Sequence, residues 1–221
     1  MTVDLEDLRL ALYRGFASDG RAPSDAALAS LLGVDEATVR DGLAELATAR
    51  HLAFGADGRI ALAHPFAGGP FGFSVMGRET LWWGGCCWDS FAIPNLVPTE
   101  PEVLVATTCP GCGEALAWTV TRDGPPDGDE IAHFLVPMAH VWDDVLRACG
   151  NQRIFCDEDC LDSWLTRTGE TKGYPMDLAQ LWRLARGWYA GRLDRGYVRR
   201  EPAAAKAYFR EVGLSGPFWG L

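Results

Sequence analysis

Two cysteines and an aspartate follow a Gly-Gly turn in the stretch 82–90 of this 221-residue sequence. Cys86 and Asp89 are three residues apart, so they share one face of any helix that begins at the turn. A thiol at a helix N-terminus has a lowered pKa, and the thiolate is its reactive form. Three tryptophans in the same stretch would exclude water and raise the pKa of the Asp89 carboxyl, which could then carry a proton at neutral pH. A nucleophile beside a proton donor predicts a bond-cleaving site. The alternative is that Cys86 and Cys87 are core thiols and Asp89 is a helix cap.

A second group of cysteines has the spacing of a metal site. Cys109 and Cys112 form a Cys-x-x-Cys pair in a Pro-Gly turn, and Cys156 and Cys160 form a second close pair further along. Such a turn, met by a pair at a strand-to-helix junction, is a frequent tetrahedral zinc arrangement. The long separation of the pairs requires a folded insert, which residues 115–150 could supply. The alternative is that the first pair only shapes a turn. The remaining cysteine, at position 149, ends the apolar stripe of its helix and is predicted to be a core residue.

The N-terminal residues 1–66 are predicted to form a winged-helix-like module. Apolar periodicity and caps indicate helices over 4–17, 24–33 and 35–50, and a hairpin follows over 52–62. A winged helix suggests DNA binding, but the third helix is acidic and a duplex would repel it. We therefore favour a structural role for this module. The acidic positions on that helix are Asp35, Glu36, Asp41 and Glu45.

The rest of the chain is predicted to form one α+β body. Residues 67–80 are rich in glycine and proline and are interpreted as a connection. Over 81–221, short apolar strands alternate with helical segments, and we expect the strands to form a mixed sheet. The fold class is therefore α+β, with an N-terminal winged-helix-like module followed by a mixed-sheet domain.

Composition restricts the partners and the compartment. The net charge of −10 argues against general affinity for nucleic acid and for anionic membrane surfaces. No apolar run approaches the length of a membrane span, and the acidic N-terminus does not resemble a signal peptide. A cytoplasmic location is expected, where thiols stay reduced. Seven cysteines in such a protein indicate metal binding or catalysis rather than disulfides.

The order of these features resembles the organomercurial (alkylmercury) lyase family over nearly the whole chain. The winged-helix-like start leads to Trp-Gly-Gly-Cys86-Cys87-Trp88-Asp89, then Ile93-Pro94, and a late Phe155-Cys156. In that family a Trp-Cys-x-x-Asp segment supplies one cysteine and the aspartate, and a later Phe-Cys supplies the second cysteine. The resemblance implies that Cys86, Asp89 and Cys156 have these roles, in an alkylmercury-lyase-like domain over 81–221.

What the family implies is protonolysis of a carbon–mercury bond by two thiolates and an aspartic acid. Soft thiolates select soft metals, and a carboxyl kept protonated is a competent general acid. No cofactor is needed for this chemistry, although a structural zinc fits the cysteine pairs. The expected partners are a small organometallic substrate and a low-molecular-weight thiol or a metal-accepting protein that takes the product, with no nucleic acid and no membrane.

The sequence also departs from the family pattern, which leaves alternatives open. Cys87 doubles the first cysteine, and Cys112 and Cys160 turn two single cysteines into pairs. If zinc binds all four paired cysteines, Cys156 is not free for mercury and Cys87 becomes the candidate second thiol. One alternative function is therefore a zinc-containing homologue without lyase activity, which binds a soft metal or uses a different substrate. A metal-responsive winged-helix regulator is the other.

Overall fold

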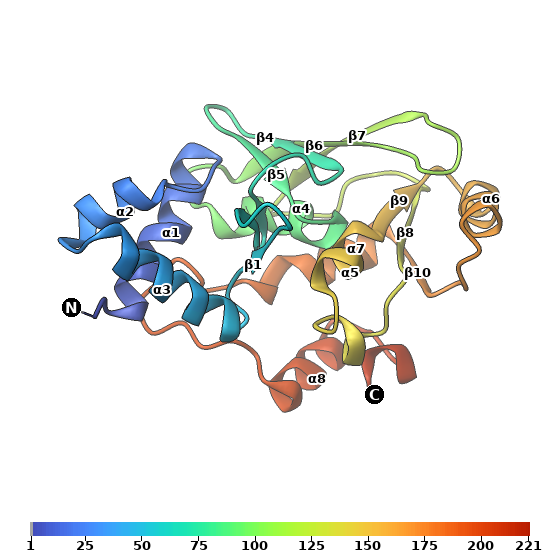
Figure 1. The fold of residues 1–221 in the computed structure, drawn as a ribbon. Coiled ribbons are helices and arrows are strands. Elements are labelled where there is room, and N and C mark those ends of the chain that lie inside the picture. The colour runs from blue at the N-terminus through green and yellow to red at the C-terminus, as the bar shows by residue number, and fades with distance from the viewer. Residues whose placement is uncertain (1) are drawn as a thin grey trace.

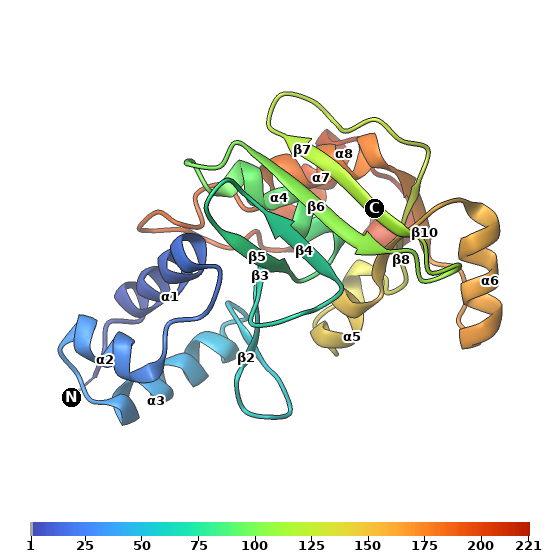
Figure 2. The same ribbon diagram turned by 90° about the horizontal axis from the view of Figure 1, so that it is seen from above.

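The computed structural model describes residues 2–221 and has an α+β fold, as the sequence predicts (Figure 1). Three helices open the chain and lie together at one end of the molecule, at the left in Figures 1 and 2. Each begins at an acidic or serine N-cap whose side chain accepts a hydrogen bond from a backbone N–H of the first turn. Their bounds are α1 Leu5–Asp19, α2 Asp25–Leu32 and α3 Glu36–Thr48.

A seven-stranded sheet follows, in the order β1-β2-β3-β5-β4-β6-β7. The predicted hairpin is its first two strands, and β2 continues by pairing with β3. The N-terminal region is thus continuous with the main sheet, while its winged-helix assignment stays a prediction. The strands are β1 Ala53–Phe54, β2 Ile60–Ala63, β3 Phe66–Ala67, β4 Phe73–Met76, β5 Leu81–Gly84, β6 Glu102–Thr108 and β7 Ala115–Thr121.

The prediction of a mixed sheet is wrong, because every strand pair in residues 2–221 is antiparallel. The reason is the position of β4. Strands β5 and β6 are joined through helix α4 (Cys87–Leu96), a crossover that would suit a parallel pair. Instead β4 lies between them and pairs antiparallel with both. This strand comes from the stretch 67–80, which the sequence presents as a connection.

The C-terminal half of the chain contributes a smaller three-stranded sheet, in the order β10-β8-β9. A short helix precedes β9 and another helix follows it, so one strand separates two helical segments. The elements are β8 Ile131–Phe134, the 3-10 helix η1 Met138–His140, α5 Val145–Gly150, β9 Gln152–Phe155, α6 Glu158–Thr168, β10 Tyr174–Asp177, α7 Leu178–Trp188, α8 Pro202–Glu211 and the 3-10 helix η2 Pro217–Trp219.

Helix α4 is the centre of the core. Every residue of this helix except Asn95 is buried, because the helix packs against the large sheet on one side and against α7 on the other (Figure 2). The N-terminal helices are attached to the same core, since Phe16 of α1 stacks on Phe66 and its carbonyl accepts a hydrogen bond from the Trp82 indole at 2.9 Å. The Gly-Gly turn that precedes α4 therefore opens into the interior, where polar groups need partners.

Within residues 2–221, none of the helices combines the length and the apolar character that a membrane span requires.

Candidate active site

The Gly-Gly turn holds the start of α4 tightly against the sheet. Cys86 is the N-cap of this helix, and its sulfur accepts a hydrogen bond from the Asp89 N–H at 3.4 Å. A Cβ on Gly85 would collide with the Asp89 carboxylate and would lie 2.9 Å from a Leu62 methyl. Only glycine leaves room for the carboxylate at this position, and Cys86 and Asp89 therefore lie side by side, as their spacing predicts.

Asp89 lies between two hydrogen-bonding side chains from distant segments. His64 Nδ1, in the link between β2 and β3, lies 2.9 Å from Asp89 Oδ2, and the Tyr189 hydroxyl donates to Asp89 Oδ1. Tyr189 is the residue that ends α7. All three side chains are almost completely buried. Both carboxylate oxygens thus have a partner, which fixes the carboxylate in one orientation.

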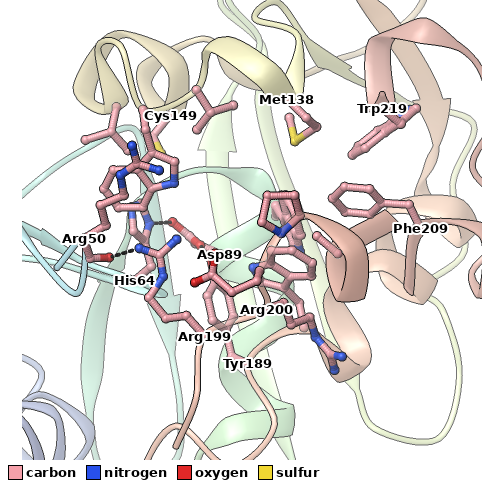
Figure 3. A pocket seen from close by; sticks show the side chains of 18 of the residues that line it. Arg50, His64, Asp89, Met138, Cys149, Tyr189, Arg199, Arg200, Phe209 and Trp219 are labelled. Carbon is pink, nitrogen blue, oxygen red and sulfur yellow. Dashed lines mark hydrogen bonds and ion pairs between the residues drawn. The ribbon is translucent and has the colours of Figure 1, made fainter. Parts of the chain in front are cut away.

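The second thiol beside Cys86 is Cys149, which lies at the end of α5. The two thiols lie close enough for each to shift the pKa of the other. The Cys149 sulfur also lies within 4.8 Å of a ligand atom of both His64 and Asp89. Cys149 is buried, in line with its interpretation as a core residue, but it also lines the same cavity as Cys86. Figure 3 shows how Cys149, His64, Asp89 and Tyr189 converge from four segments.

Burial reverses the pKa shifts that the sequence suggests. Desolvation raises the pKa of the Cys86 thiol well above its ordinary value, and the hydrogen bond to Cys149 and the charge of Asp89 act in the same direction. The position at a helix N-terminus does not compensate for this loss of water. For Cys149, the hydrogen bond from Cys86 lowers the pKa, but burial and the Asp89 charge outweigh it and the net pKa is raised. Both thiols are therefore protonated at rest.

The pKa of Asp89 is lowered rather than raised. Burial does act to raise it, as expected beside tryptophan, but the charge of His64 and the hydrogen bonds from His64, Tyr189 and Cys86 together outweigh burial. The sequence expectation of a protonated carboxyl is therefore wrong. Burial and the neighbouring Asp89 charge in turn raise the pKa of Tyr189 far above its ordinary value, so this side chain remains a hydrogen-bond donor.

The two thiols and the carboxylate face a cavity of about 480 Å³ that opens to solvent. This size, and a lining that includes several tryptophan and tyrosine side chains, are typical of a small-molecule pocket. Trp142 and Trp188 form part of its wall, together with four arginines. The guanidinium groups of Arg199 and Arg200 donate to the backbone carbonyls of residues 50 and 187, at 2.9 and 3.0 Å. These hydrogen bonds fix the two arginine side chains in the cavity wall. Cys86 and Cys149 line the same open cavity.

The other predicted site residues lie elsewhere. Cys87 is fully buried and does not line the cavity, because the next position along the helix points about 100° away. Cys156 lies with Cys109, Cys112 and Cys160. The sulfurs of these four residues are all within 4.8 Å of one another. The structure therefore brings together the four cysteines predicted as a metal site, and it separates Cys156 from Cys86.

Sequence reasoning missed Cys149, His64 and Tyr189 as site residues. For Cys149 a signal existed in the short strand that ends at Ile154-Phe155, directly before Cys156. Four residues of strand extend the chain by about 13 Å, so the cysteines before and after this strand cannot both reach one small site. His64 and Tyr189 are far from Asp89 in sequence, and no local pattern pairs them.

Two neighbouring thiols beside a carboxylate are a ligand set that suits a soft metal. The family model "MerB: Alkylmercury lyase" matches residues 66–190, which is more than half of the chain. The chain therefore belongs to the alkylmercury lyase family, whose enzymes cleave a carbon–metal bond and act on small organomercurials without a cofactor. The sequence-based resemblance is confirmed.

A solved structure, the crystal structure of the mercury-bound form of MerB2, has a similar fold. The TM-score is 0.60 at 18% sequence identity, and the match covers 82% of this chain and 87% of that chain. At this identity the likeness shows the fold. A search of curated proteins found no match.

Proposed function

We propose that this chain cleaves the carbon–mercury bond of an organomercurial by protonolysis, with Cys86 and Cys149 as the mercury ligands and Asp89 as the proton carrier. The observation that supports it most directly is the meeting of two thiols and a carboxylate in one cavity, within a family of carbon–metal lyases. Thiol sulfur prefers soft metals such as mercury, and a carboxylate within reach of both sulfurs can move their protons.

The pKa directions suggest where the transferred proton originates. At rest Cys86 and Cys149 carry protons, while Asp89 is ionised. When the organomercury cation bonds to Cys86, that thiol loses its proton. We assign Asp89 as the acceptor, because its backbone N–H already contacts the Cys86 sulfur and its carboxylate lies in the same cavity.

The second thiol completes the reaction. Cys149 binds the same mercury, and its thiol proton is also released. Donation from two sulfurs weakens the carbon–mercury bond, and the proton held by Asp89 is transferred to the carbon. The hydrocarbon leaves and Hg(II) remains on the two sulfurs. In total, two thiol protons are used: one ends on the carbon, and the other leaves with the group that the substrate first carried on mercury.

His64 and Tyr189 act as positioning residues in this proposal. An ionised carboxylate only accepts hydrogen bonds, so both side chains donate to Asp89 at rest. These bonds favour the ionised state that can take up the thiol proton. Once Asp89 is protonated, the His64 charge and the two hydrogen bonds, which favour the ionised carboxylate, disfavour keeping the proton there and help its transfer to the carbon.

The reaction needs no cofactor, because the side chains supply both the metal ligands and the proton. The four-cysteine cluster lies outside this chemistry, as a candidate structural metal site. Hg(II) would leave the pocket by exchange onto a low-molecular-weight thiol or a metal-accepting protein, since thiolate ligands exchange through associative attack by another thiolate.

The test is to incubate the protein with phenylmercuric acetate and excess thiol and to measure benzene. We expect benzene release in wild-type protein, and in a parallel single-turnover reaction without added thiol we expect one Hg(II) to be retained per chain. Stoichiometric binding of the arylmercurial with no benzene would refute cleavage, and would favour the alternative of a homologue that binds a soft metal without lyase activity.

A further inference from the structure

The four-cysteine cluster has the dimensions of a metal centre. The sulfurs of Cys109, Cys112, Cys156 and Cys160 all lie within 4.8 Å of one another, and the Cys112 and Cys156 sulfurs are 3.5 Å apart. Four Zn–S bonds of about 2.3 Å in a tetrahedron place the sulfurs about 3.8 Å apart. A disulfide requires about 2.05 Å, and all four cysteines are free. The arrangement therefore matches four thiolates around one ion.

The first half of the cluster is a tight turn between β6 and β7. The Cys109 N–H donates to the Glu114 carbonyl at 2.8 Å, and the Gly113 N–H donates to the Cys109 carbonyl at 2.9 Å. Gly113 has a φ of 85°, a left-handed conformation that suits glycine. This turn aims both of its cysteine side chains at the same point, as the Cys-x-x-Cys spacing predicts.

The second half is the junction between β9 and α6. Cys156 directly follows β9, and Cys160 lies in the first turn of α6. The helix is capped by Asp157, whose carboxylate accepts the Cys160 N–H at 2.7 Å. This cap fixes the orientation of the first helical turn and holds Cys160 on the same side as Cys156.

The two halves approach more closely than side chains would permit. A Cβ on Gly111 would clash with the Cys160 carbonyl oxygen and would lie 2.7 Å from the Cys160 Cβ. Arg167 of α6 also donates to the Pro110 carbonyl. Figure 2 shows the ends of β6 and β7 reaching α6 at the end of the molecule opposite α1–α3. The turn and the helix are therefore built to meet at the cysteines.

We propose that this cluster binds one Zn²⁺ as a closed structural site. Four protein thiolates complete a tetrahedral coordination sphere and leave no open position for a substrate, which is the pattern of structural rather than catalytic zinc. An all-sulfur ligand set excludes Ca²⁺ and Mg²⁺, which prefer oxygen. The ion joins the large sheet to the small one, through segments more than forty residues apart in the sequence. Cys112 is exposed, so metal can enter from solvent.

Metal analysis of full-length protein purified without chelator is the direct test. We expect one zinc per chain, and a Co²⁺-substituted protein with the intense visible d–d bands of tetrahedral thiolate coordination. Cys112→Ser and Cys160→Ser should each lose zinc, and their Tm should fall by more than about 4 °C. Cys149→Ser is the matched control, because it removes a cysteine outside the cluster and should keep a full equivalent of zinc.

Three results would overturn the proposal. The first is wild-type protein, purified without chelator, that contains no zinc. The second is an iron–sulfur absorption spectrum in place of zinc. The third is zinc that stays at one equivalent in both Cys112→Ser and Cys160→Ser. The Co²⁺ spectrum is recorded on wild-type protein, so the test stands even if the variants do not fold.

Discussion

The two sulfur sites of this molecule both use cysteine side chains, but they differ in burial and in the number of thiols. Cys86 and Cys149 are 2% and 4% exposed and lie beside an ionised carboxylate, so their protons are retained until a metal displaces them. Cys109, Cys112, Cys156 and Cys160 form a ring of four in which Cys112 is exposed. Two thiols leave a soft metal free to keep a bond to carbon, whereas four thiols fill its coordination sphere. The number of cysteines and their access to water thus distinguish the proposed catalytic site from the proposed structural metal site.

Strand β9 is the element that keeps the two sites apart. Cys149 precedes this strand and Cys156 follows it, so each site receives one cysteine from the same short segment. A metal at the second site would fix the far end of β9 and, through it, the position of α5. The comparison can be tested by variants that affect one site and spare the other.

The largest expected effect distinguishes Cys149 from Cys156. Cys86→Ser and Cys149→Ser should abolish release of benzene from phenylmercuric acetate, because two sulfur donors are needed to weaken the carbon–mercury bond. Cys156→Ser should keep turnover per folded molecule while losing zinc. Gas chromatography of benzene and metal analysis of the same samples measure both properties. An active Cys149→Ser with an inactive but folded Cys156→Ser would reverse the roles that we assign to these two residues.

Asp89→Asn should lower turnover by about 10²–10⁴-fold, the usual contribution of a general acid–base group. The amide has nearly the same shape but cannot carry the proton from thiol to carbon. Binding of the arylmercurial to Cys86 should persist, and mass spectrometry of the trapped adduct under single-turnover conditions would measure it. Loss of binding together with loss of turnover would indicate that Asp89 instead shapes the pocket.

Substitution of one glycine beside each site should have a smaller effect on turnover or on stability. In Gly85→Ala the added methyl meets the Asp89 carboxylate, and misplacing this group should reduce turnover by about 10²-fold with zinc retained. In Gly111→Ala the methyl meets Cys160, which should cost about 1–3 kcal/mol of stability as overpacking and leave turnover intact. Denaturant unfolding and steady-state kinetics distinguish the two. Equal effects of both variants on turnover would mean that the sites are not separate.

The pH dependence should reveal the partners of Asp89. Turnover needs ionised Asp89 and is lost as the pH falls through its lowered pKa. Removing a group that lowers this pKa should move the acid limb of kcat/KM to higher pH. We expect the shift to be larger in His64→Gln than in Tyr189→Phe, because the His64 charge contributes more to the lowering.

His140→Gln is the control for this pH experiment. His140 also pairs with an aspartate, at 2.8 Å from Asp143, but this pair is exposed. The variant should leave the acid limb unchanged. An identical acid limb in wild type, His64→Gln and Tyr189→Phe would show that Asp89 does not control the profile.

The smallest expected effect concerns DNA. The acidic third helix predicts no sequence-specific duplex binding at physiological salt. A gel shift with the protein's own upstream region should show no complex, with or without mercury. A salt-sensitive complex at sub-micromolar protein would support the regulator alternative.

The features that depend on neighbouring residues could be predicted from the sequence. The three N-terminal helices follow from apolar periodicity and caps, and the Gly-Gly turn places Cys86 against Asp89 because three residues span one helical turn. Spacing also predicted the two cysteine pairs, since each pair is local, whereas the meeting of the pairs depends on the folded chain. The α+β class and the family could likewise be read from the sequence.

The distant groups of the proposed active site could be identified only from the folded chain. Cys149, His64 and Tyr189 reach Cys86 and Asp89 only because α5, the β2–β3 link and the end of α7 pack around α4. The protonation states also depend on this packing. Desolvation and hydrogen bonding act against each other at Asp89, and their balance is set by the depth of burial and the number of donors. Neither quantity is written in local sequence, because both come from contacts between segments that only the folded chain brings together.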